Sequence, residues 1–273
     1  MKDSAPRSRM HILIGGEAGQ GLATVGNLLS RVLVRSGYRI VVTQSYQSRI
    51  RGGHNTFSVA AGGDDLVSPG GPVDILVALN EETISMHREE LSDRGLVLAD
   101  KAAGPDDDAC LRVPFEELAG GEMFINTVAL GLLCALLGIG DERAVDVLES
   151  NFGAKHRDVL DENLRALGAA YEWAKEHGGG RHRLPPAQPS AGRVMLNGNE
   201  AIALGAVSAG ARFCAFYPMT PSTSVPLTMI RMADRMGLVV EQAEDEIAAV
   251  NMAVGASYAG APSLVATSGG GFA

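Results

Sequence analysis

Short apolar runs alternate with segments that carry apolar residues at helical spacing along most of the chain. The pattern predicts strands at 11–15, 39–43, 55–61, 73–79 and 95–100. It predicts helices at 22–36, 81–91, 123–137, 141–152 and 160–177. Gly37 follows the first helix and is expected to be its C′ residue, because glycine adopts the left-handed conformation needed there. Regular alternation of strands and helices predicts an α/β fold.

The alternation stops and then restarts. Residues 179–193 are rich in glycine, then in proline and basic side chains, and are predicted to be a linker. Beyond them, helices are predicted at 197–210, 222–236 and 245–259, and strands at 212–216, 238–242 and 263–268. We therefore expect two parallel-sheet α/β domains, at residues 1–178 and 194–273. The second has few strands to bury both faces of a sheet, so we expect it to be incomplete.

Composition limits the class of protein. With 273 residues, 46% hydrophobic and 20% charged, the chain has an ordinary globular composition, and its net charge of −9 argues against nucleic-acid binding. No apolar run reaches the roughly 18–20 residues of a membrane span, so we expect a cytoplasmic protein without membrane contact. The three scattered cysteines form no CxxC pair, which predicts reduced thiols, no metal site and no iron–sulfur ligands on this chain.

A glycine-rich turn joins the first predicted strand to the first helix. Its glycines Gly16, Gly19 and Gly21 could present backbone N–H groups to an anion at the start of the helix. The spacing is not G-x-G-x-x-G, and no Gly-Lys-Ser/Thr follows, so neither a dinucleotide motif nor a P-loop is predicted. Two interpretations stay open: a phosphate-bearing ligand other than NAD, or glycines that only make a tight turn.

A basic loop precedes the third predicted strand. Arg49 and Arg51 flank one residue and are followed by two glycines and His54, so their guanidinium groups could bind phosphate. The alternative interpretation is an exposed basic loop or a subunit contact.

The end of strand 212–216 carries a turn with two prolines, which hold Tyr217 and Thr220 in extended conformations. Ligands of parallel α/β sheets bind at the carboxyl ends of strands. The next strand also ends in polar residues, with Glu244, Asp245 and Glu246 close together. The sequence therefore predicts a binding site here. The alternative for at least one of these acids is stabilisation of a helix N-terminus.

Four motifs, in this order, resemble the 2-oxoacid:ferredoxin oxidoreductase family over nearly the whole chain. They are Gly15-Gly16-Glu17-Ala18-Gly19-Gln20-Gly21, Ser48-Arg49-Ile50-Arg51-Gly52-Gly53-His54, Tyr217-Pro218-Met219-Thr220-Pro221-Ser222-Thr223, and Glu244-Asp245-Glu246 running on to Thr267-Ser268-Gly269-Gly270-Gly271. The first two resemble the family's gamma module and the last two the beginning of its alpha module. A gamma module fused ahead of an alpha module is similar to the large subunit of the 2-oxoglutarate type.

The resemblance implies that the second domain is a truncated pyrimidine-binding domain for thiamine diphosphate. It implies that Glu246 hydrogen-bonds the pyrimidine N1′ of the cofactor, with Glu244 as the alternative. Thr220 would bind the substrate carboxylate, while Ser222 or Thr223 could instead cap the following helix. The residues implied on the substrate side are Tyr217, Thr220, Ser222 and Thr223. The residues implied for coenzyme A are Gly16, Gly19, Gly21, Arg49, Arg51 and His54.

The implied reaction is the oxidative decarboxylation of 2-oxoglutarate to succinyl-CoA with reduction of ferredoxin. Magnesium and an iron–sulfur cluster would lie on a separate beta subunit, which pairs with this chain in a heterotetramer. This polypeptide alone is expected to be inactive. Alternatives are a coenzyme A- or nucleotide-binding or assembly subunit without a catalytic role, or the same enzyme class acting on pyruvate or branched-chain 2-oxoacids.

Overall fold

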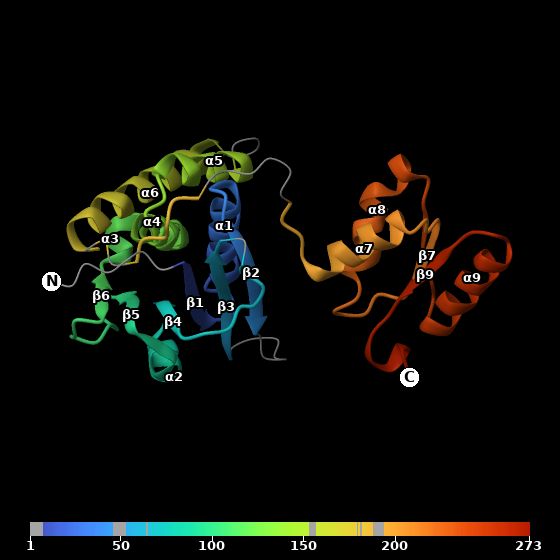
Figure 1. The fold of residues 1–273 in the computed structure, drawn as a ribbon, viewed down its shortest axis with the longest axis horizontal. Coiled ribbons are helices and arrows are strands. Elements are labelled where there is room, and N and C mark those ends of the chain that lie inside the picture. The colour runs from blue at the N-terminus through green and yellow to red at the C-terminus, as the bar shows by residue number, and fades with distance from the viewer. Residues whose placement is uncertain are drawn as a thin grey trace. The chain divides into compact units, whose positions relative to one another are not determined.

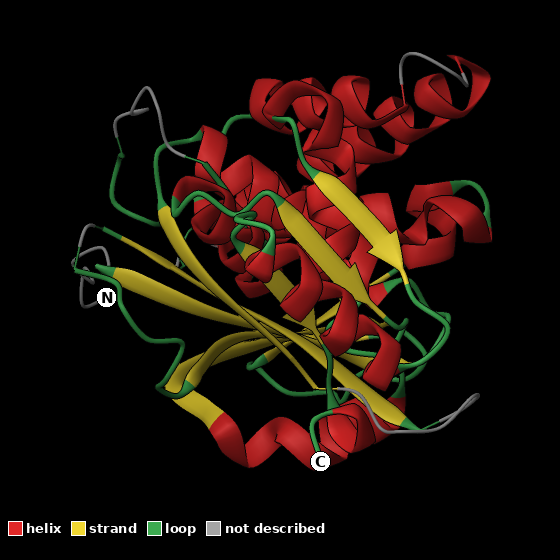
Figure 2. Cartoon of the chain, turned by 90° about the vertical axis from the view of Figure 1, so that its right-hand side faces the viewer, coloured by secondary structure: helices red, strands yellow, loops and turns green. Residues whose placement is uncertain are grey.

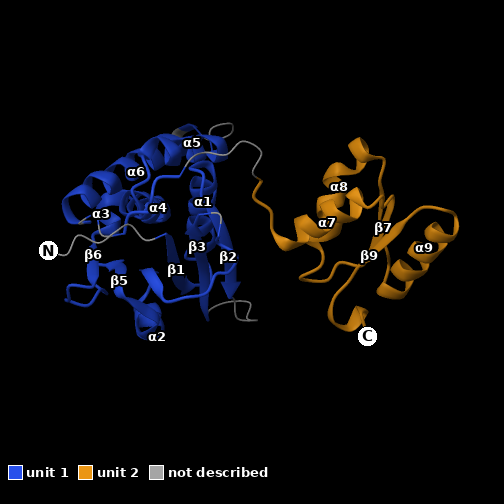
Figure 3. Ribbon diagram, viewed as in Figure 1, with its two compact units in different colours: residues 1–193 blue, residues 194–273 orange. Residues whose placement is uncertain are grey.

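The structure is a computed structural model that describes residues 8–45, 53–63, 65–152, 157–178, 180, 182–187 and 194–273. The chain divides into two compact units, unit 1 from Met1 to Arg193 and unit 2 from Val194 to Ala273 (Figure 3). Both units combine helices with a sheet (Figure 2), so the predicted α/β class is confirmed.

Unit 1 contains a six-stranded sheet in the order β2-β3-β1-β4-β5-β6. The strands are β1 (Arg9–Glu17), β2 (Arg39–Ser45), β3 (His54–Gly62), β4 (Val73–Ala78), β5 (Leu91–Asp100) and β6 (Cys110–Val113). β1, β4, β5 and β6 run parallel, but β3 is antiparallel to both β1 and β2. The sheet is thus mixed and not wholly parallel as expected. The connection from β2 to β3 is too short for the helical crossover that a parallel pair needs.

Helices cover both faces of this sheet. They are α1 (Leu22–Arg35), α2 (Glu81–His87), α3 (Phe115–Ala119), α4 (Ile125–Leu137), α5 (Asp141–Phe152) and α6 (Arg157–His177), with 3₁₀ turns at Arg88–Glu90 and Glu122–Phe124. In Figure 1, α1 and α3–α6 lie on one face and α2 on the other. Alternate residues of β1 serve the two layers: Ile12 and Ile14 are buried toward the large helical layer, and Leu13 toward α2.

Helix α1 shows how the sequence pattern becomes packing. Val25, Leu29 and Val32 are spaced on one face and are fully buried in the main core. Burying each such side chain contributes about 1.5–3 kcal/mol relative to leaving it in water. The helix ends before Gly37, whose φ of +97° is left-handed, so the predicted C′ glycine is confirmed.

Part of the predicted linker packs against unit 1. Leu184 is buried, and its N–H donates to the carbonyl of Leu137 at 3.0 Å. The Tyr38 hydroxyl donates to the Pro185 carbonyl at 2.8 Å. The described residues 182–187 therefore belong structurally to unit 1, because one apolar side chain, one backbone N–H and one backbone carbonyl find partners there.

Unit 2 contains a three-stranded sheet in the order β8-β7-β9, with β7 parallel to both neighbours. Its elements are α7 (Gly198–Ser208), β7 (Phe213–Phe216), α8 (Ser224–Met236), β8 (Val239–Gln242), α9 (Glu246–Tyr258), β9 (Ser263–Ala266) and a 3₁₀ turn at Gly269–Gly271. α7 and α8 pack on one face, around Cys214 and Phe216, while α9 packs on the other, around Ala215 (Figure 1). The predicted parallel sheet with helical crossovers is confirmed in this unit. No described helix of either unit has both the length and the apolar character needed to cross a membrane.

Candidate functional site

The carboxyl ends of β7, β8 and β9 meet at one edge of the sheet of unit 2. The segments that leave this edge are 217–223, 243–246 and 267–271, and we call them together the strand-end site. Because all three strands are parallel, these segments necessarily emerge on the same side. Two of them are the motifs that the sequence marks as a binding site.

The turn 217–223 is held from two neighbouring elements. Asn199, in the first turn of α7, donates from Nδ2 to the Pro221 carbonyl at 2.8 Å and to Ser224 Oγ at 2.6 Å. Ser268, after β9, donates from Oγ to the Thr220 carbonyl at 3.0 Å. The Thr220–Pro221 peptide is cis. The hydrogen bonds from Asn199 and Ser268 hold the backbone of the turn, while the side chains of Tyr217 and Thr220 are exposed beside it.

The hydroxyl groups of this turn have different partners. Ser222 donates its hydroxyl hydrogen to the Met219 carbonyl at 2.8 Å. Thr223 is the N-cap residue of α8, but its side chain makes no capping hydrogen bond. The alternative that Ser222 or Thr223 caps the helix is therefore wrong. A serine hydroxyl has only one hydrogen, so Ser222 is not available as a donor to a ligand in this arrangement.

The three clustered acids are separated by the structure. Asp245 caps α9, because its Oδ1 accepts the N–H of Ala248 at 2.6 Å. Glu244 is exposed, whereas Glu246 is partly buried in the first turn of α9. The prediction that at least one acid stabilises a helix N-terminus is thus confirmed for Asp245.

Glu246 lies against the glycine turn that follows β9. A Cβ atom on Gly271 would overlap both the Glu246 side chain and Thr267 Oγ1, so only glycine leaves room for this approach. Thr267 Oγ1 is buried and has no hydrogen-bond partner in the described part of the chain. The site therefore brings together a half-buried carboxyl group and a hydroxyl group that lacks a partner.

Charge is unevenly distributed around the site. Arg235 is the last basic residue of the sequence, and residues 247–273 carry no charged side chain. The charged groups at the strand ends are the carboxylates Glu244, Asp245 and Glu246, with Glu241 in β8. Within unit 2, the strand-end site is thus anionic.

The glycine turn of unit 1 is closed by Gln20. Its Oε1 accepts the N–H of Glu17 at 2.7 Å, and its Nε2 donates to the Leu79 carbonyl at 3.2 Å. A side chain at Gly16 would collide with Gln20, and one at Gly21 would overlap Asn126 of α4. Gly19 and Gly21 have φ of +99° and +80°. Packing and backbone conformation account for these glycines, while α1 begins without a side-chain cap; anion binding there stays a prediction.

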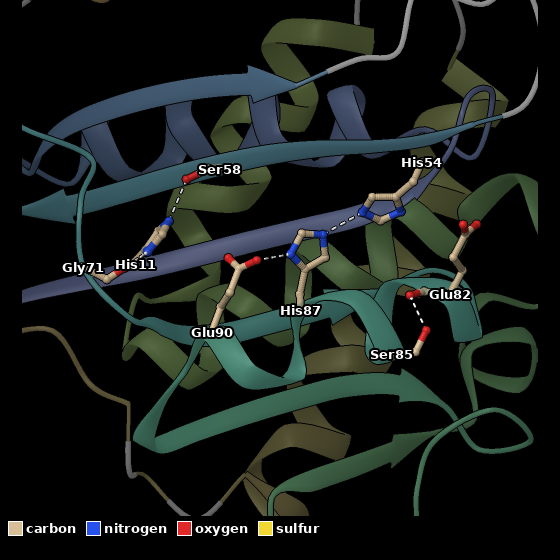
Figure 4. Close-up of polar contacts among 8 residues, drawn as sticks. All are labelled: His11, His54, Ser58, Gly71, Glu82, Ser85, His87 and Glu90. Carbon is tan, nitrogen blue, oxygen red and sulfur yellow. Dashed lines mark hydrogen bonds and ion pairs between the residues drawn. The ribbon is translucent and has the colours of Figure 1, made fainter.

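Of the predicted basic loop, only the end falls within the described residues. Arg49 and Arg51 lie outside them. His54 begins β3 and is buried, with its Nε2 2.7 Å from His87 Nε2 of α2 (Figure 4). Burial, followed by the neighbouring His87, lowers the pKa of His54, and Glu82 acts in the opposite direction. His54 therefore contacts a second imidazole ring.

Sequence reasoning missed Asn199, and it quoted Thr267 and Gly271 within a motif without giving them a role. All three act through contacts between elements that are distant in the chain. One signal was present: Asn197 and Glu200 form a capping box, in which each side chain accepts the other's backbone N–H at 2.8 and 3.0 Å. Recognising that box places Asn199 on the first turn of a helix.

Two family models match the chain. Residues 11–173 match the model described as pyruvate ferredoxin/flavodoxin oxidoreductase. Residues 204–273 match the model described as pyruvate flavodoxin/ferredoxin oxidoreductase, thiamine diphosphate-binding.

Individual relatives agree with these models. The chain is 27% identical to the 2-oxoacid:ferredoxin oxidoreductase subunit alpha of Sulfolobus sp, over 97% of this chain and 50% of the relative. The chain thus spans about half the length of the curated relatives it matches along most of its length.

Among solved structures, the 2-oxoglutarate:ferredoxin oxidoreductase from Magnetococcus marinus, with 2-oxoglutarate, coenzyme A and succinyl-CoA bound, is similar with a TM-score of 0.87 and 28% identity. That likeness covers 97% of this chain and 48% of the other. The gamma subunit of the keto/oxoacid ferredoxin oxidoreductase from Geobacter sulfurreducens has a TM-score of 0.53 and 26% identity, covering 62% of this chain and 98% of that subunit.

Proposed function

Because this chain belongs to the pyruvate ferredoxin/flavodoxin oxidoreductase family, we propose that it provides the alpha part, with a fused gamma-type unit, of a thiamine diphosphate-dependent 2-oxoacid:ferredoxin oxidoreductase. One observation carries the proposal. The segment that matches the thiamine diphosphate-binding model holds Glu246 and the Thr220 turn at the same strand-end edge, and Ser268 joins the turn to the segment after β9.

The proposed substrate is 2-oxoglutarate, which would be converted to succinyl-CoA with reduction of ferredoxin. The support is the likeness to the Magnetococcus enzyme, whose structure contains 2-oxoglutarate, coenzyme A and succinyl-CoA. The same reaction on pyruvate or a branched-chain 2-oxoacid is the alternative. A partner beta subunit would carry magnesium and an iron–sulfur cluster, and we propose a cytoplasmic heterotetramer.

The residues at the strand-end site fit the pyrimidine ring of thiamine diphosphate. A carboxyl group suits a ring nitrogen as hydrogen-bond partner, and Glu246 is the half-buried carboxyl group at this edge. The buried Thr267 hydroxyl lacks a partner within the described residues, which is consistent with a polar group arriving beside it. When bound, the cofactor supplies the carbanion chemistry that 2-oxoacid decarboxylation needs.

The residues of this chain have the following proposed roles. Glu246 holds a proton in a hydrogen bond at N1′ of the pyrimidine, and its position beside Gly271 favours it over the exposed Glu244. Thr220 donates its hydroxyl hydrogen to the carboxylate of the 2-oxoacid. Tyr217 and Thr223 stay predicted neighbours of the substrate. Ser222 is not proposed as a donor, because its hydrogen is bonded to Met219.

Unit 1 is proposed to bind coenzyme A with Gly16, Gly19 and Gly21, at the start of α1, and with the basic loop. The helix start without a side-chain cap supports an anion there, since its N–H groups lack the usual acceptor. Arg51→Ala is expected to weaken coenzyme A binding, measured by calorimetry on the full-length subunit. Equal affinity would assign the loop to a structural role or a subunit contact.

The decisive test compares two neutralised acids. Glu246→Gln and Glu244→Gln remove one carboxylate each, two residues apart, in the full-length subunit assembled with its partner. Glu246→Gln is expected to lower the decarboxylation rate by roughly 10² or more, because a positioned acid–base side chain contributes at least that much. Glu244→Gln is expected to leave the rate near wild type. Decarboxylation rates near wild type in both variants would contradict a catalytic role of Glu246 and favour the assembly-subunit alternative.

Thr220→Val tests the substrate contact with nearly unchanged shape. A hydrogen bond to a charged group contributes about 1.5–3 kcal/mol, so KM for the 2-oxoacid should rise by roughly ten- to hundredfold. Ser222→Ala is the matched control, and its KM should change far less because its hydroxyl donates to Met219. A larger effect for Ser222→Ala would reverse the assignment.

A further inference from the structure

Unit 1 contains three titratable side chains joined by hydrogen bonds, and two of them, His87 and Glu90, have no part in the proposed function. Glu90 Oε1 lies 2.7 Å from His87 Nδ1, and His87 Nε2 lies 2.7 Å from His54 Nε2 (Figure 4). The side chain of Glu90 is 53% exposed and that of His87 13%, whereas His54 is only 7% exposed. The three groups therefore lead stepwise from solvent into the space between β3 and α2.

Hydrogen-bonding rules assign the positions of the protons on these three side chains. The ionised carboxylate of Glu90 can only accept, so His87 carries its proton on Nδ1. A neutral His87 then has its lone pair on Nε2 and accepts from His54, which must carry its proton on Nε2. The remaining nitrogen, His54 Nδ1, is left with a lone pair. That atom is buried and has no hydrogen-bond partner among the described residues.

The surroundings keep the pair of rings in place. A Cβ atom on Gly15 would lie 3.2 Å from His54 Cε1 and would overlap Thr83, so the glycine leaves room for the ring beneath β1. Among the described residues, the charged groups nearby are Glu82 on α2, which raises the pKa of His54, and Glu17, which is exposed opposite His54 in β1. Arg88, which lies between His87 and Glu90 in the sequence, forms an ion pair with Asp107.

We propose that Glu90, His87 and His54 form a proton relay between solvent and the buried Nδ1 atom of His54. A weakly acidic group, such as a hydroxyl or a thiol, would give its proton to His54 Nδ1. The Nε2 proton of His54 then passes to His87 Nε2, and the Nδ1 proton of His87 passes to the Glu90 carboxylate, from which water removes it. One proton enters and one leaves, and no electrons are transferred. His54 accepts the proton, and His87 and Glu90 act through it.

The relay can hold one extra proton and not two. At 2.7 Å, the two facing Nε2 atoms share a single hydrogen, since two N–H groups would point at each other. The rings should therefore titrate together as a pair, with one macroscopic proton uptake. Two imidazole rings that merely pack against each other would titrate separately.

Nitrogen-15 histidine NMR on the full chain tests the relay. At pH 8 we expect the Nε2–H tautomer for His54 and the Nδ1–H tautomer for His87. Glu90→Gln retains an acceptor oxygen for His87 but cannot take up a proton. We therefore expect at least tenfold slower exchange of the His54 ring proton with water. Glu89→Gln is the matched control, because Glu89 is an adjacent exposed acid, and it should leave that exchange rate unchanged.

Each alternative outcome contradicts the relay. A proton on His54 Nδ1 at pH 8, or separate titrations of the two rings, would show packing only. Equal exchange rates in the Glu90 and Glu89 variants would exclude Glu90 as the exit. A second variant, His54→Gln, removes the ring whose Nε2 faces His87 Nε2, so the nitrogen-15 signals of His87 should change. Unchanged His87 signals would show that the rings are not coupled.

Discussion

The two units of this chain bury their apolar residues very differently. Unit 1 has a continuous core in which strand and helix residues such as Ile12, Leu29 and Leu133 are fully buried. Unit 2 has a smaller core on the α7–α8 face and only alanines, among them Ala215 and Ala249, as its buried residues on the α9 face.

The outer surface of α9 shows the other side of this difference. Ile247 is 75% exposed, Val254 62% and Tyr258 96%, and these positions lie on one side of the helix. The opposite side packs on the sheet through small residues. A helix that is apolar on both sides is typical of one that is covered on both sides. The unit with the proposed cofactor site thus depends less on its own core than unit 1 does.

The largest expected effect is on the free energy of unfolding, and it is tested by truncating one core residue in each unit. Leu133→Ala in α4 should cost about 3–5 kcal/mol of unfolding free energy, because a fully buried leucine in a dense core leaves a cavity. Met229→Ala in α8 is also fully buried but should cost nearer 2 kcal/mol, since its thin surroundings can collapse. Denaturant unfolding measures both, with Trp173, the single tryptophan, reporting on unit 1.

Equal losses at the two positions, or a larger one at Met229, would contradict the comparison. Far-UV circular dichroism must accompany the fluorescence, because unit 2 has no tryptophan of its own.

A pair of glycines gives a smaller, sharper contrast. Gly21 in unit 1 and Gly237 in unit 2 have left-handed φ of +80° and +63°. Gly237→Ala has open space around the new methyl group and should cost about 1 kcal/mol for conformation alone. Gly21→Ala also overlaps Asn126, so its loss of thermal stability should be clearly larger. Adding Asn126→Ala should restore part of that loss; no restoration would show that the contact is unimportant.

The smallest expected effect is in the pH dependence of stability. The lowered pKa of folded His54 means that the unfolded chain binds this proton more readily. The contribution of neutral His54 is therefore present above the unfolded pKa of about 6.5 and is lost as the pH falls below it. Unit 2 contains no histidine and should lack this term.

Thermal melts of the wild type and of His54→Gln between pH 8 and 5 measure this dependence. The variant should show a flatter profile in the unit 1 transition. Parallel profiles for the two proteins would assign the acid sensitivity to other groups.

Much of the fold follows from local pattern. The α1 helix and its Gly37 ending, and the βαβ order of unit 2, need only periodicity and one glycine. β6 was missed because four residues, Cys110–Val113, are too few to show alternation. The antiparallel direction of β3 depends on a short connection, which apolar pattern does not report.

For the candidate site, the sequence predicted which segments lie at the strand ends. The turn 217–223 and the acids at 244–246 were placed there because both follow apolar strands, and their ligand contacts stay predictions. The contact of Asn199 with Pro221, and that of Gly271 with Glu246, depend on the packing of distant segments. His87 and Glu90 are three residues apart and visible in the sequence, but His54 joins them only through the arrangement of β3 and α2.

No charged side chain follows Glu246 in the sequence, so the electrostatic potential across the strand-end site is uneven. A ligand lying across it meets carboxylates at 244–246 and no cation from any residue beyond Arg235. Two like charges 4 Å apart repel by about 4 kcal/mol at an effective dielectric constant of 20. A ligand with one neutral and one anionic end would therefore be oriented by this charge if it binds as proposed. We expect its neutral end to face these acids and its anionic end to need counterions outside residues 236–273.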